Sequence, residues 1–243
     1  MASATGVPER VPDVQTDENE PLLGRVGDAS QKDGKPLYYN LTIGTAVLAQ
    51  AGVWVLAAIR IQYVLRSDLA QIKTDRPKLL NSAALLLLAQ GTLILQPTHT
   101  TQQKRQGTIT HALFNQLALG AFIAGWVVIE ANKYKNGIPH FESPHAILGF
   151  TTYILLIIQV LVGFTQYFVP SLYGGVDKAK RIYKYHRVAG YGVLILVLAT
   201  VCTATQTTFN KTTYHIQLWA MILLSVIILA GILPRIKKQK LGL

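Results

Sequence analysis

Apolar residues in this chain occur in long runs instead of alternating with polar ones. Six runs can be marked, over residues 41–65, 79–96, 111–131, 145–168, 186–206 and 214–233. Each is close to the roughly 20 residues that a helix needs to cross about 30 Å of hydrocarbon. Because lipid offers no hydrogen-bond partner to a backbone amide, such segments are predicted to be helices. The pattern therefore predicts an all-α membrane protein with six transmembrane helices, of which the second is the shortest.

Polar segments flank the six runs at both ends of the chain. The first 40 residues hold most of the acidic residues and lack the apolar stretch of a cleaved signal peptide. We expect three parts: a disordered cytosolic tail over residues 1–40, a six-helix membrane domain over 41–233, and a basic cytosolic tail over 234–243.

Composition and charge agree with a membrane protein and set its orientation. The chain is 50% hydrophobic and only 14% charged, which is too apolar for a soluble domain of this length. Its net charge of +11 comes from basic residues scattered over the loops, so nucleic acid is not expected as a partner. More of these residues lie beside the termini and the 97–110 and 169–185 loops than on the opposite side. The positive-inside rule then predicts that both termini are cytosolic.

Two kinds of site are excluded by what the runs lack. A single cysteine, Cys202, cannot form a disulfide framework, a CxxCH haem attachment or a zinc cluster. No acidic residue stands in the middle of a run, although a proton-coupled carrier usually needs a carboxylate there.

Three of the runs begin with a histidine: His111, His145 and His186. The predicted topology puts His111 and His186 at one depth, where two imidazoles can hold one iron, and His145 at the other face. Gly149 and Gly190 stand four residues after His145 and His186, so the helix face under each ring is bare. The alternative is that these histidines are interfacial residues and the glycines serve helix packing.

The segments "THALFNQLAL", "SPHAILGFTTYILLIIQVLVGF" and "KYHRVAGYGVLILVLATV" resemble the cytochrome b561 family over residues 76–206. Its six-helix members hold two b-type haems through four histidines on helices two to five. The resemblance implies that His111 and His186 ligate the iron of the cytosolic-side haem and that His145 ligates that of the outer haem. The matching segments place four further residues beside the haems: Asn115, Gly149, Gln159 and Gly190.

The second run departs from the family pattern. The family begins this helix with His-Pro, and here the sequence is "DRPKLL": Pro77 matches, as does Pro97 at the far end, but Arg76 replaces the histidine. An arginine is not deprotonated in proteins and cannot be an axial ligand. His145 is therefore left without its expected partner.

Three accounts of this departure remain open. Lys78 or His140 replaces the missing ligand; or the outer haem is absent, which leaves Arg76 and His145 as an interfacial cationic pair; or His145 alone holds a haem with an open iron face. We favour loss or weakening of the outer haem.

The resemblance implies a haem b membrane oxidoreductase that takes electrons from cytosolic ascorbate. Its acceptor is ascorbyl radical or a ferric chelate, as in a monodehydroascorbate reductase or ferrireductase. With only the cytosolic-side haem intact, transfer is transmembrane or confined to that side. The alternative is a haemless or non-conducting member that acts in membrane assembly or trafficking, and either form can be a homodimer like many relatives.

Four basic residues stand near the predicted cytosolic haem: Lys104, Arg105, Lys184 and Arg187. They would attract an anionic enediolate such as ascorbate, and Lys184 is the strongest candidate. The positive-inside rule alone also places basic residues on this side, whatever the function.

The N-terminal tail contains "ENEPLLG", which matches an acidic dileucine sorting signal formed by Glu18, Leu22 and Leu23. An adaptor that reads this signal would route the protein to a vacuolar or endosomal membrane, which we favour over the plasma membrane.

Overall fold

The computed structural model describes residues 29–32, 34–65, 69–237 and 241, with the backbone alone for 63–65 and 69–78. Its long helices are α1 (Ala46–Leu65), α2 (Leu69–Leu95), α3 (Thr101–Asn136), α4 (Pro144–Phe168), α5 (Val176–Ala204) and α6 (Leu218–Ile232). Short helical turns are η1 (Leu37–Leu41), η2 (Pro170–Tyr173), η3 (Asn210–Tyr214) and η4 (Leu233–Arg235). The predicted all-α fold with six long helices is confirmed.

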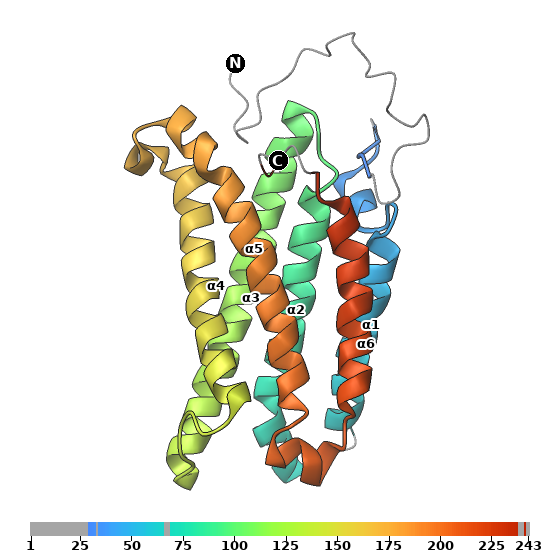
Figure 1. Cartoon of the computed structure of the whole chain (residues 1–243), viewed down its shortest axis with the longest axis vertical. Helices are drawn as coiled ribbons and strands as arrows, with labels where there is room; N and C mark the ends of the chain where they lie inside the picture. Colours follow the sequence, from blue (N-terminus) through green and yellow to red (C-terminus); the bar gives the residue numbers. More distant parts are fainter. Residues whose placement is uncertain (1–28, 33, 66–68, 238–240, 242–243) are drawn as a thin grey trace.

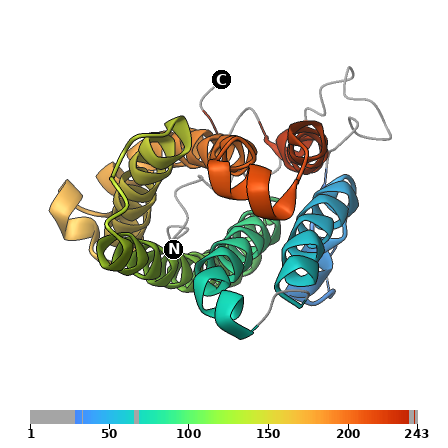
Figure 2. The same cartoon turned by 90° about the horizontal axis from the view of Figure 1, so that it is seen from below.

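The six helices form a closed ring of antiparallel neighbours (Figure 1). Each packs against the next along the chain, and α6 returns to pack against α1. Figure 2, a view along the ring, shows α2, α3, α4 and α5 around one half and α5, α6, α1 and α2 around the other. The short helix η1 lies at the end of the bundle where α6 finishes, which we call the η1 end.

The outward faces of the helices are apolar, as expected of a protein that lies in lipid. Helices α3, α4 and α5 and the segment Leu218–Arg235 are long and apolar enough to cross a membrane, and α1 and α2 contribute shorter apolar stretches, Ala46–Gln62 and Leu79–Leu95. Large apolar side chains are exposed on these surfaces, among them Leu161 at 57% and Trp219 at 67%. A surface of this kind is stable in hydrocarbon and not in water, so the protein is an integral membrane protein.

Three helices begin well before the apolar runs that predicted them. Helix α2 begins at Leu69, α3 at Thr101 and α5 at Val176, whereas the runs begin at 79, 111 and 186. Hydropathy marks the part of a helix that lies in lipid, but its start is set by capping. Thr100 and Gln103 form a capping box, in which the Thr100 hydroxyl accepts from the Gln103 amide at 3.3 Å. Only α4 begins close to its histidine, after the cap Ser143.

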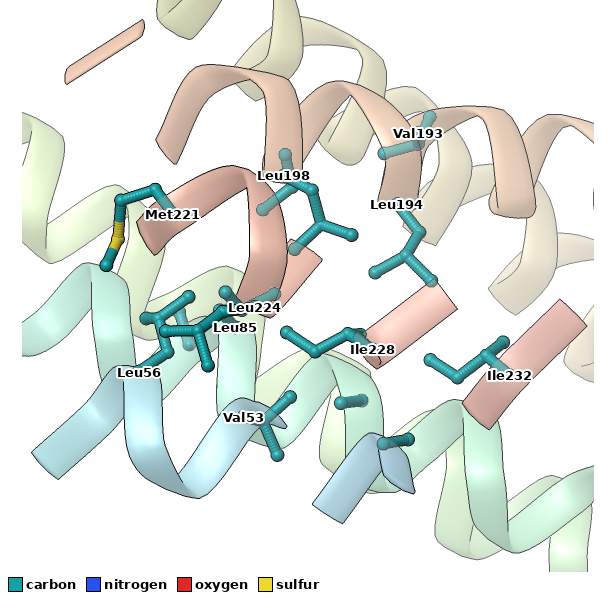
Figure 3. Packing of buried hydrophobic residues seen from close by; sticks show 14 of the residues in the cluster. Val53, Leu56, Leu85, Val193, Leu194, Leu198, Met221, Leu224, Ile228 and Ile232 are labelled. Carbon is teal, nitrogen blue, oxygen red and sulfur yellow. The ribbon is translucent and has the colours of Figure 1, made fainter. Parts of the chain in front are cut away.

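The half of the ring formed by α1, α2, α5 and α6 is filled with side chains. Figure 3 shows Leu85, Leu198 and Ile228 meeting in this core. Helices α1 and α6 approach so closely that a Cβ on Gly52 would lie 2.6 Å from Ile228 Cγ1. The two cavities described below lie mainly among α2, α3, α4 and α5, and Leu56 and Arg60 of α1 also line the larger one.

Parts of both predicted tails pack against the η1 end of the bundle. Gln31, Asn40 and Arg235 are buried, and the Gln31 amide donates to the Pro97 carbonyl at 3.0 Å. Packing against the bundle therefore includes Ala29, the first residue described, and extends past residue 234. Residues 1–28, which include Glu18, Leu22 and Leu23, lie outside the described residues.

Candidate functional site

A cavity of about 210 Å³ near the η1 end contains both His111, from α3, and His186, from α5. We call it the His111/His186 cavity. Helices α2 and α4 and the segment after α6 complete its wall, which is mostly apolar and includes Leu88, Leu156, Val160, Phe164, Val193 and Leu194. The expectation that the two histidines share one depth agrees with this placement.

The imidazole of His111 is held by helix α2. Its Nδ1 lies 2.8 Å from the carbonyl oxygen of Gly91, which can only accept a hydrogen bond. The proton is therefore on Nδ1, and Nε2 carries a free lone pair. Asn115, one turn further along α3, donates to the His111 carbonyl at 2.7 Å.

Gly91 stands at this contact and was not predicted. A Cβ there would lie 2.7 Å from Asn115 Nδ2, so any larger residue would displace the Asn115 amide beside His111. Nothing in the sequence links Gly91 with a histidine 20 residues later, because the link is a backbone carbonyl.

The imidazole of His186 is held by helix α4. Gln159 Nε2 lies 3.0 Å from His186 Nδ1 and donates to the His186 carbonyl at 2.6 Å. The ring rests on Gly163, where a Cβ would be 2.6 Å from the ring carbon Cε1. The space beside Gly190 is taken by Gln159, whose Nε2 would be 2.9 Å from a Cβ at that position. Gly190 thus makes room for the amide that positions His186.

The four basic residues expected near this cavity divide into two pairs. Lys104, which is 7% exposed, and Arg187 line the cavity. Arg105 and Lys184 are exposed and do not line it, and Lys184 Nζ lies 5.1 Å from the centre of the Tyr185 ring. The structure therefore brings Lys104 and Arg187 to the histidines, and not Lys184.

Arg235 also lines the His111/His186 cavity and was not predicted as a site residue. Basic residues are common at the ends of membrane-spanning helices, so the position of Arg235 in the sequence does not mark it as a binding-site residue.

A second cavity, of about 530 Å³, lies further from the η1 end and contains His145. We call it the His145 cavity. His145 Nδ1 donates to the Thr200 carbonyl at 3.1 Å, so its Nε2 is unprotonated in the same way as that of His111. Gly149 lines this cavity, with space for a Cβ at 3.5 Å from Thr200 Cγ2. Leu156 lines both cavities and so stands between them.

No second histidine lines the His145 cavity among the described residues. His140 does not line it; its Nδ1 lies 2.8 Å from Oε2 of Glu130, which does line the cavity. The side chains of Arg76 and Lys78 lie outside the described part of the chain.

The donor set suits a haem better than a bare metal ion. Nowhere in the described residues do three or more His, Cys, Asp or Glu side chains gather as a metal site. A porphyrin supplies four ligands to its iron, so two imidazoles in an apolar cavity suffice. The lone pair on His111 Nε2 and the apolar wall fit such a group.

Comparison with known proteins gives one family and two relatives. Residues 77–212, more than half of the chain, match the family described as eukaryotic cytochrome b561. The protein named transmembrane ascorbate-dependent reductase CYB561 of Pongo abelii is 26% identical over 145 residues, which cover 59% of this chain and 56% of the relative. The Homo sapiens protein of the same name is 25% identical over 133 residues, which cover 55% and 51%.

The chain thus spans about half the length of the curated relatives that it matches. The family match includes His111, His145 and His186. It covers most of α2 and all of α3, α4 and α5, and it ends before α6. With the helical membrane fold and the histidines in the cavity, this match shows that the chain belongs to the eukaryotic cytochrome b561 family.

Proposed function

We propose that the protein is a haem b membrane oxidoreductase whose haem iron is held between His111 Nε2 and His186 Nε2. One observation carries this proposal: histidines from two different helices line a single apolar cavity, each with Nδ1 engaged by a neighbouring helix. Anchoring of Nδ1 leaves Nε2 as the ligand atom, as in most histidine-ligated metal centres. When bound, the haem supplies a one-electron carrier.

Ligation by His186 sets a condition on Gln159. Iron binding at Nε2 places the proton on Nδ1, so the partner atom must be an acceptor. The amide of Gln159 would then turn Oε1 towards the ring and give up the hydrogen bond that its Nε2 donates to the His186 carbonyl at 2.6 Å. Gln159 is thus a positioning residue for His186.

The electron donor in this proposal is ascorbate or a similar anionic reductant. Lys104 and Arg187 put positive charge at the cavity on the η1 end, which attracts an enediolate anion. Both relatives are named ascorbate-dependent reductases. The acceptor is ascorbyl radical or a ferric chelate, and the η1 end with both termini faces the cytosol.

We further propose that only the His111/His186 haem is intact. His145 is the one histidine among the described residues of its cavity. Arg76 cannot replace a histidine ligand, because its guanidinium keeps its proton.

The test is the haem content and spectrum of the purified full chain in detergent. Reduction with dithionite or ascorbate should give the sharp α-band of a six-coordinate b haem, with a haem-to-protein ratio near one. His111→Ala and His186→Ala should abolish the band, whereas His145→Ala and the exposed-site control His99→Ala should keep it. A wild-type protein without haem contradicts the proposal.

A further inference from the structure

Arg235 is a buried cation whose hydrogen bonds are incomplete. It follows α6 directly, is 3% exposed and lines the His111/His186 cavity. Its Nη2 donates to the carbonyls of Asn40 at 2.9 Å and Leu93 at 3.3 Å. Its Nε and Nη1 have no hydrogen-bond partner among the described residues.

The bonds from Nη2 have a structural explanation. Helix α2 ends at Leu95, and the last carbonyls of a helix lack partners within it. Arg235 donates to the Leu93 carbonyl, and the side-chain amide of Asn40 donates to the Ile94 carbonyl at 2.8 Å. A cation here also opposes the negative end of the helix dipole. This role uses one of three guanidinium nitrogens and leaves the other two unexplained.

Within the described part of the chain, the charge of Arg235 has no counter-ion in its surroundings. No acidic residue is among the described residues that line the cavity, and neither ion pair found in the described chain includes Arg235. The cavity holds two further cations, Lys104 and Arg187. A buried charge that is neither paired nor fully hydrogen-bonded is costly, so an arrangement of this kind is completed by an anion.

We propose that Arg235 binds an anion with two oxygen acceptors, a carboxylate or enediolate, in the His111/His186 cavity. Its unpartnered Nε and Nη1 groups would donate charge-assisted hydrogen bonds to the oxygens of such an anion. The proposal rests on the function proposed above, where this chemistry has two sources: a haem propionate or the anionic reductant. Arg235 lies outside the family match at 77–212, whereas most of the cavity wall lies within it.

The experiment compares Arg235→Gln and Arg235→Lys in the purified full chain in detergent. Arg181→Gln is the matched control, because Arg181 is an exposed arginine of α5 that does not line the cavity. Each variant is first checked for a single size-exclusion peak and for its thermal unfolding. Haem release to apomyoglobin is then measured without reductant, and the KM for ascorbate by the rate of haem reduction.

The two sources of the anion give different results. If Arg235 holds a propionate, Arg235→Gln releases haem about tenfold faster or more, as expected for loss of charged hydrogen bonds. If it holds the reductant, haem release is unchanged and the KM for ascorbate rises by about tenfold or more. Arg235→Lys should give a smaller change of the same kind, and Arg181→Gln none.

The proposal is wrong if a folded Arg235→Gln protein matches the wild type in both measurements. If Arg235→Gln does not fold, Arg235→Lys decides, because it keeps the charge that caps α2 but loses the Nε and Nη1 donors; no change in that variant overturns the proposal. A wild-type protein without haem would refute the function instead. The anion site is then tested by thermal stabilisation with ascorbate, which should occur in the wild type and not in Arg235→Gln, and equal stabilisation overturns it.

Discussion

The ring of His186 lies where the first carbon of any side chain at position 163 would have to be. A Cβ on Gly163 would be 2.6 Å from His186 Cε1 and 3.1 Å from Nε2, the proposed ligand atom. The glycine therefore determines where the imidazole stands in the cavity.

We predict that Gly163→Ala displaces His186 and weakens haem binding, while the fold remains. The measurement is the haem-to-protein ratio, together with the α-band of the reduced protein. Gly120→Ala is the matched control, because a Cβ at Gly120 of α3 meets no atom within 4 Å. Equal haem content in both variants would mean that the position of His186 does not depend on Gly163.

A second prediction concerns Arg76. If the His145 cavity lost its haem because this position holds an arginine, Arg76→His should restore a second haem and raise the haem-to-protein ratio from about one to about two. The Thr200 carbonyl holds the His145 ring in an orientation in which Nε2 can bind iron, and the cavity of about 530 Å³ is retained. A ratio that stays near one would count against a vestigial site. A ratio near two in the wild type would show that Arg76 does not disable it.

The sequence identified the histidines that we propose as haem ligands, but it did not identify all the groups that hold their rings. His111, His145, His186, Gln159 and Asn115 have side chains that stand out in apolar segments. The groups that fix the rings include the backbone carbonyls of Gly91 and Thr200, which no residue type encodes. The cations could not be sorted either, because burial of Lys104 and exposure of Lys184 depend on which face of a helix meets the cavity.

Among the helices, the contact between α1 and α6 closes the ring. A Cβ on Gly231 would overlap the backbone of Ala49 and would lie 2.6 Å from its Cβ. The Thr45 hydroxyl donates to the Gly231 carbonyl at 2.9 Å beside this contact. The atoms of Ala49 that a Cβ on Gly231 would meet are its backbone and its Cβ, so they cannot rotate out of the way.

We predict that Gly231→Ala separates α1 from α6 and lowers the free energy of unfolding by about 1–3 kcal/mol, the usual cost of overpacking. The measurement is thermal or denaturant unfolding in detergent. Gly192→Ala on α5 is the control, because no atom lies within 4 Å of a Cβ at that position. Similar stability of the two variants would contradict the prediction.

The existence of six long helices followed from apolar length, but their limits did not. A run of apolar residues marks the part of a helix that lies in lipid. Helices α3 and α5 extend beyond that part through mainly polar residues, several of which are good helix formers. His111 and His186 therefore lie inside their helices, with polar turns before them. The capping box of Thr100 and Gln103 marks the start of α3, whereas α5 begins after Gly175 without a side-chain cap.

In the whole molecule, most of the buried apolar core lies among α1, α2, α5 and α6, and both cavities lie mainly among α2, α3, α4 and α5, with Leu156 lining each. This arrangement could not be predicted from hydropathy, because all six helices are similarly apolar on the outside. It depends on the closure of α6 onto α1, which lies outside the family match.

Sorting is also a property of the whole molecule. If Glu18, Leu22 and Leu23 form a signal, Leu22→Ala with Leu23→Ala should move the protein from vacuolar or endosomal membranes to the plasma membrane. The measurement is the position of a fluorescent fusion in cells, with Asp13→Ala, upstream of the motif, as the control. An unchanged location in the double variant would mean that the motif is not read.

Arg235 completes the wall of the His111/His186 cavity from the segment after α6, and Asn40 supports it from the segment before α1. Arg235 follows α2, α3, α4 and α5 in the sequence, so the ribosome releases both histidines before the residue that completes the wall. Until Arg235 is in place, the η1 end of the cavity lacks this part of its wall.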